Sequence, residues 1–296
     1  MHYPRLAQLG WNHELAHQFR DLVGDDGVPG RVTVQHRGAS GVATEGGDLL
    51  AQVTGRLRHA AAPGDLPVVG DWVALRDGLI DAVLPRRSKF SRKTPFTQVA
   101  EQVLVANVDV AFLVMGLDEK DFNVRRLERY LATAWEGGAT PVIVLNKTDL
   151  AAELDAQLAE VEAVAFGVPV HAVNALAAEG VDVLEPYLAG AKTGVLLGSS
   201  GVGKSTLINA LLGDVRLATG VVRSDGRGRH TTTHRELLVL PAGGVLIDTP
   251  GLRELQLWDA DDGLDRTFAD VGELAARCRF SDCSHEAEPG CAVREA

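Results

Sequence analysis

The chain has 296 residues, of which 46% are hydrophobic and 23% are charged, and its formal net charge is −11. These values are typical of a globular protein with two or three domains and exclude the strongly basic composition of most dedicated nucleic-acid binders. The sequence lacks a run of about 18 apolar residues and the pattern of a signal peptide, so we expect a cytoplasmic protein without a membrane span.

The first 95 residues are predicted to form a helical arm and a small β-barrel. Residues 1–30 carry scattered apolar positions, which suggest a short helix or an arm. From residue 31 to 95, short β-prone runs alternate with glycine and proline, as in a barrel or sandwich. The predicted strands cover residues 31–35, 49–53, 68–69, 72–75 and 79–84. Five strands in about 65 residues fit an OB-fold.

From residue 96 to 258, apolar strands alternate with helical stretches, which predicts a doubly wound α/β domain. We expect strands at 103–115, 142–145, 168–173, 194–198, 235–240 and 245–248, and helices at 123–135, 154–165 and 205–212. The run 103–115 is almost continuously apolar, which is typical of a single strand buried on both faces.

The first of three nucleotide motifs is Asn146-Lys147-Thr148-Asp149, at the end of a predicted strand, where α/β proteins bind ligands. The Asp149 carboxylate can accept two hydrogen bonds from guanine, whereas adenine lacks that donor pair. Lys147 is expected to lie over the base and brace the phosphate loop. The Ala175 N–H is expected to bond the guanine O6. A strand-end turn without a ligand is the alternative for the isolated motif.

A complete phosphate-binding loop follows, with the sequence Gly198-Ser199-Ser200-Gly201-Val202-Gly203-Lys204-Ser205. A strand precedes the loop and a helix continues through Thr206, which is the context that this motif requires and which adds Thr206 to the expected nucleotide contacts. The glycines allow backbone N–H groups to surround the phosphates. Lys204 is expected to contact the β- and γ-phosphates as a catalytic group, and the Ser205 hydroxyl to bind Mg²⁺.

The third motif, Asp248-Thr249-Pro250-Gly251, ends another buried strand. Asp248 is expected to bind Mg²⁺ through water, and the Gly251 N–H to sense the γ-phosphate. The next residue is Leu252, at a position where GTPases often have a catalytic glutamine. Hydrolysis must therefore position its water with a different group.

The loop between the second and third motifs carries two further candidates. His230 is a candidate catalytic group for orienting water, because histidine can do so near neutral pH. A solvated loop histidine is the alternative. Thr232 is expected to take part in catalysis by binding Mg²⁺ in the GTP-bound state only.

The C-terminal residues 259–296 contain all three cysteines of the chain. Their grouping in a protein expected in the cytosol favours a metal over disulfides. Four ligands suit one tetrahedral Zn²⁺ and leave no open position, so the site would be structural. These ligands are Cys278, Cys283, His285 and Cys291.

Basic residues gather before the α/β domain and on its first predicted helix. They are Arg56, Arg58, His59, Arg86, Arg87, Lys89, Arg92 and Lys93, with Arg125, Arg126 and Arg129 on the helix. An OB-fold with a basic face is a common platform for RNA. A charge run is also often only a solvated surface, and pairing of Arg125 and Arg126 with Glu128 is a third explanation.

The base motif comes first, although it comes last in an ordinary GTPase, so the domain is predicted to be circularly permuted. The barrel, the permuted GTPase and the Cys-Cys-His-Cys tail together resemble the ribosome small-subunit-dependent GTPase family (ribosome biogenesis GTPase A, RsgA or YjeQ). Residues 66–73, 106–109, 228–233 and 282–291 match the family pattern as well. Asn174 replaces the usual serine, and the chain stops at Ala296, where the family continues into a helical region.

The resemblance implies a GTPase that binds the small ribosomal subunit and its rRNA, assists late subunit maturation and is stimulated by the subunit. It also implies an α/β P-loop GTPase domain at 96–258, an OB-fold at 31–95 after the 1–30 arm, and a truncated zinc domain at 259–296. The expected ligands are GTP or GDP, Mg²⁺ and one Zn²⁺. A monomer that binds neither DNA nor membranes is expected.

Two other functions stay open at this point. In the first, the chain is an rRNA-binding assembly factor that uses GTP as a structural ligand with negligible turnover. In the second, it is a P-loop enzyme that phosphorylates a small molecule, which the guanine-selective motif disfavours.

Overall fold

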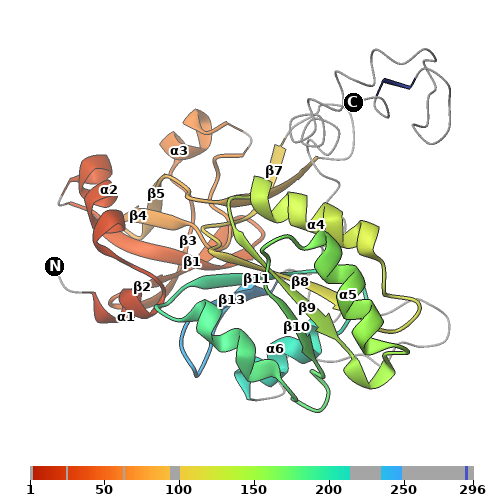
Figure 1. Ribbon diagram of the computed structural model, residues 1–296. Coiled ribbons are helices and arrows are strands. Elements are labelled where there is room, and N and C mark those ends of the chain that lie inside the picture. Colours follow the sequence, from red (N-terminus) through yellow and green to blue (C-terminus); the bar gives the residue numbers. More distant parts are fainter. Residues whose placement is uncertain are drawn as a thin grey trace. The chain divides into compact units, whose positions relative to one another are not determined.

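The computed structural model describes residues 3–24, 26–62, 64–93, 101–213, 235–248 and 291–292. The chain divides into two compact units, Met1–Leu255 and Gln256–Ala296, and each is considered by itself. In the first unit, two helices, a group of short strands and a larger α/β part follow one another along the chain (Figure 1). Within the described ranges, no helix has both the length and the apolar character needed to cross a bilayer.

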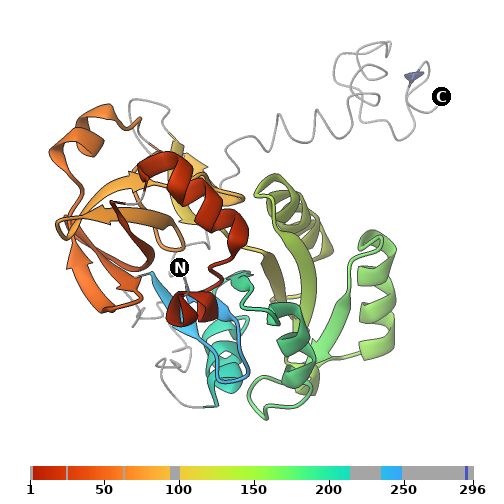
Figure 2. The ribbon, with the colours of Figure 1, turned by 90° about the vertical axis from the view of Figure 1, so that its left-hand side faces the viewer.

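The N-terminal segment forms two helices, α1 (Pro4–Gln8) and α2 (His13–Val23). The Asn12 side chain accepts a hydrogen bond from the Leu15 N–H at 3.0 Å and thereby caps α2. Apolar side chains of the segment share one buried cluster with Trp72 and with strands of the α/β part; they are Leu6, Leu9, Leu15 and Phe19. Figure 2 shows these helices lying across the region where the short strands meet the α/β part.

Five short strands follow: β1 (Val28–His36), β2 (Ala39–Thr44), β3 (Gly47–Ala51), β4 (Trp72–Arg76) and β5 (Leu79–Val83). β1 pairs antiparallel with both β2 and β4, while β3 pairs with β2 and β5 with β4. A parallel bridge from Val53 to Ile80 joins the chain after β3 to β5, so the strands close on themselves. The enclosed core consists of Val32, Val42, Ala51, Val73, Leu75 and Ile80.

Three details of this region differ from the sequence-based prediction. Residues 68–69 were predicted as a strand, but Val69 makes only an isolated bridge to Val105, because the chain turns at Gly70 with φ of +94°. β2 is absent from the predicted strands because its sequence, ASGVAT, is dominated by small residues with a weak β signal. A short helix, α3 (Gly55–Ala60), also lies between β3 and β4.

The α/β part contains strands β8 (Val110–Gly116), β9 (Thr140–Asn146), β10 (Val170–Val173), β11 (Thr193–Leu197), β12 (Glu236–Val239) and β13 (Val245–Asp248). Their order is β10-β9-β8-β11-β13-β12, and all neighbours are parallel except β12 and β13. Glu236 of β12 also pairs with Val34 of β1, so this sheet continues into the group of short strands.

The two faces of this sheet carry different helices. On one face, Ala111, Leu113 and Met115 of β8 share a core with Leu127 of α4 (Val124–Glu136) and Val161 of α5 (Leu154–Val164). On the other face, the alternate β8 side chains pack with α6 (Lys204–Leu212) and the 3-10 helix η2 (Val181–Leu188). The part therefore has the doubly wound arrangement expected from its alternating strands and helices.

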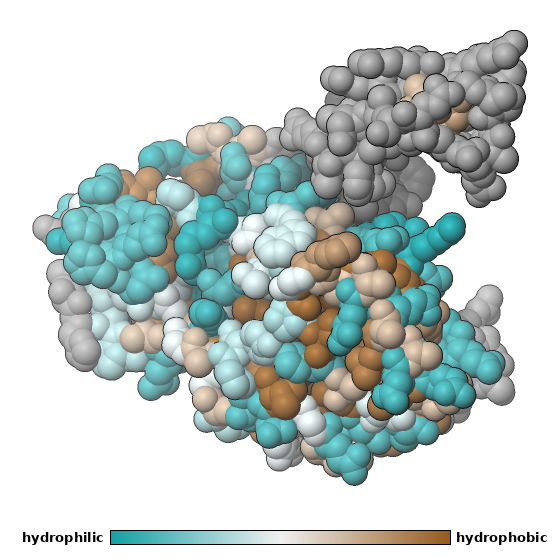
Figure 3. Space-filling model, in the orientation of Figure 1, coloured by the Kyte–Doolittle hydropathy of each residue, from teal (hydrophilic) through white to brown (hydrophobic). Residues whose placement is uncertain are grey.

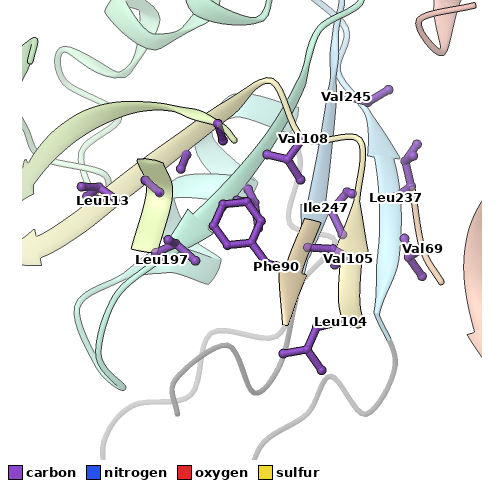
Figure 4. Close-up of a cluster of buried hydrophobic side chains, with 14 of the residues drawn as sticks. Val69, Phe90, Leu104, Val105, Val108, Leu113, Leu197, Leu237, Val245 and Ile247 are labelled. Carbon is purple, nitrogen blue, oxygen red and sulfur yellow. The ribbon is translucent and has the colours of Figure 1, made fainter. Parts of the chain in front are cut away.

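The apolar run 103–115 forms two strands rather than the predicted single one. β7 (Glu101–Ala106) ends before Asn107, whose φ of +55° redirects the chain into β8. β7 pairs antiparallel with β6 (Lys89–Lys93), so two paired strands lie on opposite sides of the domain boundary predicted at residue 95. The Phe90 side chain of β6 lies among residues of β7, β11 and β13 in the buried cluster (Figure 4).

Hydrophobic groups are unevenly distributed on the molecular surface. On the face drawn in Figure 3, the part formed by the short strands and first helices is mainly hydrophilic, whereas brown patches gather over the α/β part. Trp135 at the end of α4 and Phe166 after α5 are among the exposed large apolar residues, at 59% and 89% exposure. Isolated exposed apolar side chains of this kind are common on globular proteins.

Candidate functional site

The three predicted nucleotide motifs meet at one edge of the α/β sheet. β9 ends at Asn146, β11 leads directly into Gly198, and β13 ends at Asp248. The three strands run parallel within one sheet, so their carboxyl ends share an edge. Ligands of open α/β sheets bind at this edge, which makes it the candidate site.

Asn146 connects two loops of the candidate site. Its side chain is buried, its Nδ2 donates to the Val202 carbonyl at 2.8 Å, and its Oδ1 accepts from the Ala175 N–H at 3.0 Å. Asn146 therefore fixes the phosphate loop against the segment after β10. The Ala175 N–H, predicted to bond the guanine O6, is used inside the protein in this structure. Asn174 in turn accepts from the Leu176 and Ala177 N–H groups.

Lys147 is held by two acidic residues that follow β8. Its backbone has a left-handed φ of +67°, and its Nζ lies 2.6 Å from Asp118 Oδ2 and 2.8 Å from Asp121 Oδ2. The ammonium group therefore pairs with these carboxylates in this structure, and the expected contacts of Lys147 with the base and the phosphate loop stay a prediction. Asp149 is exposed in the short 3-10 helix η1 (Thr148–Leu150), where its carboxylate is accessible to a base.

The electrostatics of this cluster favour the charged forms. Burial alone would raise the pKa of Asp118, but hydrogen bonding and the charge of Lys147 outweigh it and lower that pKa below its usual range. Burial alone would lower the pKa of Lys147, but Asp118 and Asp121 raise it above its usual range. Asp118 and Lys147 therefore carry opposite charges near neutral pH, and the two ion pairs of Lys147 fix the direction of its side chain.

The phosphate loop has no space for a side chain at two of its three glycines, Gly198 and Gly203. Gly203 has φ of +95°, and a Cβ there would collide with the Asn146 side chain. A Cβ at Gly198 would collide with the Val114 carbonyl oxygen. The loop therefore lies directly against β8 and β9, with its backbone available for contacts to a ligand.

Lys204, Ser205 and Thr206 form the first turn of α6, immediately after this loop. The Lys204 Nζ donates to the carbonyl oxygens of Gly198 at 2.7 Å and Ser199 at 2.6 Å. Its charge and the positive end of the α6 dipole both lie at the loop, which favours an anion such as a phosphate.

A contact that the sequence did not predict joins α4 to the phosphate loop. Arg126 Nη1 donates to Ser199 Oγ at 2.8 Å, and the Tyr130 hydroxyl lies 3.4 Å from the same oxygen. Among the described residues, Arg126 has no ion pair with Glu128. Arg126 therefore belongs to the candidate site, whereas Arg125 and Arg129 are exposed.

The donors for Mg²⁺ suit that ion. Ser205 offers a hydroxyl and Asp248 a carboxylate at the same sheet edge, and Mg²⁺ prefers oxygen ligands while retaining several waters. Within the described ranges, no cluster of three or more His, Cys, Asp or Glu side chains forms a metal site. His230, Thr232 and Gly251 lie outside those ranges.

Only one of the four predicted zinc ligands lies within the described residues. Cys291 belongs to the second unit and is buried, with 2% exposure. Cys278, Cys283 and His285 lie outside the described ranges. The donor set of three thiols and one imidazole has the chemistry that Zn²⁺ requires.

Comparison with known proteins identifies the family. A family model described as RsgA GTPase matches residues 83–258. The small ribosomal subunit biogenesis GTPase RsgA of Opitutus terrae is 48% identical, over 98% of this chain and 84% of that protein. The protein of the same name from Streptomyces coelicolor is 46% identical, over 98% of this chain and 81% of its own length. This chain belongs to the RsgA GTPase family.

Solved structures support the same conclusion for the fold. The crystal structure of YjeQ from Thermotoga maritima has a TM-score of 0.63 and 30% identity, and the similarity covers 91% of this chain and 90% of that one. YloQ, described as a circularly permuted GTPase, has a TM-score of 0.56 and 25% identity over 92% of this chain and 88% of its own. The predicted circularly permuted P-loop GTPase fold is confirmed.

As a member of the RsgA GTPase family, the chain is a GTP hydrolase that binds GTP or GDP and Mg²⁺. The family match covers β8 to β13, where the motif order places the base-recognition strand before the phosphate loop. This membership favours GTP hydrolysis over the two alternatives that the sequence alone left open, a small-molecule kinase and a factor with negligible turnover.

Several basic residues expected on an RNA-binding face of this RsgA family member form ion pairs within the protein. The pairs are Arg56–Asp81 at 2.9 Å, Arg86–Asp71 at 2.7 Å, Arg87–Asp109 at 3.3 Å and Lys89–Glu101 at 2.7 Å. Arg58 and His59 of α3 are exposed. These four basic side chains are therefore less available for contacts with RNA than the sequence alone suggests.

Proposed function

We propose that this chain acts in biogenesis of the small ribosomal subunit, binds that subunit and its rRNA, and hydrolyses GTP with stimulation by the subunit. The observation that carries the proposal is the convergence of the base motif, the phosphate loop and Asp248 at one sheet edge, in permuted order. Relatives with 46% and 48% identity over 98% of the chain carry the name small ribosomal subunit biogenesis GTPase.

In this proposal, each motif residue has a defined role. Asp149 accepts hydrogen bonds from guanine, while Asn146 and Lys147 hold the surrounding loops. Backbone N–H groups from Gly198 to Ser205, the first turn of α6 through Thr206 and the Lys204 ammonium bind the phosphates.

Bound Mg²⁺ would neutralise developing charge on the phosphates. Ser205, Asp248 and Thr232 would hold the ion. The Gly251 N–H would contact the γ-phosphate and His230 would orient the attacking water. Only Ser205 and Asp248 of these lie within the described ranges.

RNA recognition is assigned to an OB-fold at residues 31–95. The pairing of β1 with β2 and β4, together with the closure from Val53 to Ile80, supports this assignment. The exposed side chains of Arg58 and His59 on α3 are candidates for contacts with RNA phosphates. An arm at 1–30, a GTPase domain at 96–258 and a zinc domain at 259–296 complete the proposed organisation.

We assign one structural Zn²⁺ to Cys278, Cys283, His285 and Cys291. Buried Cys291 supports a structural role for this group. Metal analysis of protein purified without added zinc should give one zinc per chain, and Cys291→Ser should lower that ratio. An unchanged ratio in the variant would refute the assignment. A cytoplasmic monomer with an RNA rather than a DNA partner is consistent with the proposed work on ribosomal subunits.

The decisive test is GTP turnover with and without purified small ribosomal subunits. Stimulation by small subunits, with no effect of large subunits and no turnover of ATP, would support the proposal. Lys204→Ala is the control, since it removes the charge from the phosphate loop and should abolish the stimulated activity. Turnover that is the same with and without small subunits would contradict the proposed partner.

A further inference from the structure

The contact between α4 and Ser199 gives the phosphate loop an anchor outside the three nucleotide motifs. Arg126 and Tyr130 are four residues apart, so both side chains lie on one face of α4. Both reach the Ser199 hydroxyl, at 2.8 Å from Arg126 Nη1 and 3.4 Å from the Tyr130 oxygen. Ser199 is the second residue of the loop, where the chain leaves β11.

Ser199 is held on two sides by two cations. While Arg126 donates to its side-chain oxygen, Lys204 Nζ donates to its backbone carbonyl at 2.6 Å. Fixing both oxygens restricts rotation of the residue and of the peptide group that follows it. That peptide group begins the turn whose N–H groups have to face the phosphates.

Arg126 projects from a fixed point on α4. The Asn123 side chain accepts a hydrogen bond from the Arg126 backbone N–H at 2.9 Å, which caps the helix. Leu127 and Leu131 are buried in the core shared with β8 and β9. The packing of α4 therefore places the Arg126 guanidinium. Among the described residues, this group donates its side-chain hydrogen bond to Ser199.

We propose that Arg126 is a positioning residue for the GTPase reaction, which acts through Ser199 to hold the phosphate loop in its nucleotide-binding shape. The inference rests on the proposed role of that loop. Preorganising a binding loop lowers the cost of ordering it when the ligand arrives. The contact is present before the chemical step, so its loss weakens the binding of the substrate and of the transition state equally. We therefore expect KM to rise more than kcat falls.

The test compares Arg126→Ala, Ser199→Ala and the double variant, all assayed without ribosomal subunits. We expect each single variant to raise KM for GTP, and Kd for a fluorescent GDP, about tenfold, as for loss of a hydrogen bond to a charged group. The kcat value should stay within about threefold of the unaltered protein. The double variant should bind GDP no more weakly than Ser199→Ala alone, because Ser199→Ala already removes the contact with Arg126.

Arg125→Ala is the matched control, because Arg125 is the exposed neighbour on the same helix. It should bind GDP as the unaltered protein does. Arg126→Lys should restore part of the affinity, since a lysine retains the charge but not the planar donor geometry. Equal affinities for Arg126→Ala and Arg125→Ala would overturn the proposal, as would multiplicative losses in the double variant.

Two features of these measurements make their result independent of the folding of Arg126→Ala and of the response to ribosomal subunits. Ser199→Ala leaves α4 unaltered, so it tests the contact even when Arg126→Ala fails to fold. Every measurement uses the protein alone, so a missing response to ribosomal subunits bears on the proposed function and leaves this result unaffected.

Discussion

Asn146 shows how one buried amide can organise a ligand site. Its two polar atoms bond the phosphate loop and the segment after β10, at 2.8 and 3.0 Å. A shorter or charged side chain at this position would leave a buried donor or acceptor without its partner, which costs more than the bond itself contributes. Asn146 therefore sets the relative position of two loops, whereas Asp149, three residues further on, is exposed.

The role assigned to Asp149 gives the first prediction. Asp149→Asn replaces an acceptor with a side chain that also donates, so affinity for GTP should fall about 100-fold. Affinity for xanthosine triphosphate should rise, because xanthine presents an oxygen where guanine has its amino group. Nucleotide competition against a fluorescent GDP measures both effects. Loss of affinity for both nucleotides would indicate damage to the fold and contradict the assigned role.

The pair between Lys147 and Asp118 gives a pH-dependent prediction. The pKa of Asp118 is lowered in the folded protein, so its contribution to stability is present above its unfolded pKa, about 4. The contribution is lost as pH falls through the lower folded pKa. Asp118→Asn should therefore reduce the free energy of unfolding by about 1 kcal/mol at neutral pH.

Urea denaturation of both proteins at several pH values measures this difference. It should stay constant above about pH 5 and shrink toward zero in stronger acid, where the carboxyl is protonated in both states. A difference that persists unchanged into strong acid would show that the charge of Asp118 is not responsible.

The sequence could predict motif residues but not their tertiary partners. Asn146, Lys204 and Asp248 were identified because their spacing and strand-end positions are local signals. Asp118 and Asp121 also follow a strand, so their position at a carboxyl end was a usable signal that was missed. Arg126 gave no such signal, because its contact with Ser199 spans 73 positions along the chain and depends on helix packing.

Among the elements, α4 joins the core of the α/β part to the phosphate loop. Its first turn is capped by Asn123, whose Oδ1 accepts from the Arg126 N–H at 2.9 Å. Its buried side chains include Leu127 and Leu131. The helix therefore packs against the sheet and also contacts the phosphate loop through Arg126.

This cap gives a prediction for the element. Asn123→Ala should lower the free energy of unfolding by about 1 kcal/mol, because the first turn of α4 loses an acceptor for its N–H groups. Asn123→Asp should keep most of the stability, since a carboxylate caps as well as an amide. Chemical denaturation measures both variants, and equal stability of Asn123→Ala and the unaltered protein would contradict the capping role.

Secondary structure was predictable where the signal was strong and local. β9 and β13 end at Asn146 and Asp248, as predicted, because an apolar run is followed by polar motif residues. The break inside residues 103–115 was not predictable from hydrophobicity, since both β7 and β8 are apolar. It depends on the left-handed backbone of Asn107 and on its hydrogen bonds to Arg87 and Gly70.

At the scale of the whole first unit, Arg31 ties the short strands to the α/β sheet. It is buried, and its guanidinium donates to Thr193 Oγ1 at 2.7 Å and to carbonyl oxygens of Leu9, Gly70 and Asn107. It also lies 5.0 Å from the centre of the Trp72 ring. Burial lowers the pKa of Arg31 to about 10, partly opposed by the charge of Asp109, so the group remains charged near neutral pH.

Replacing Arg31 should therefore weaken the whole unit. Arg31→Ala leaves several buried acceptors without a donor, so the free energy of unfolding should fall by about 3 kcal/mol or more. Arg31→Lys should recover only part of the lost free energy of unfolding, because one ammonium group cannot reach all these oxygens. Urea denaturation followed by tryptophan fluorescence and by GDP binding measures the effect, and a loss below about 0.5 kcal/mol would contradict this role.

The order of strands also has a consequence for synthesis of the chain. β8, β9 and β10 are neighbours both in sequence and in the sheet, and α4 and α5 lie between them. Contacts that are local along the chain form early, so the half that carries the motif Asn146–Asp149 can assemble while the phosphate loop is still untranslated. β11 then pairs with the exposed edge of β8, and β13, which is synthesised later, pairs with β11. Because the phosphate loop comes after Thr193, we expect GTP to stabilise the completed domain and to add no stability to a nascent chain that ends before Thr193.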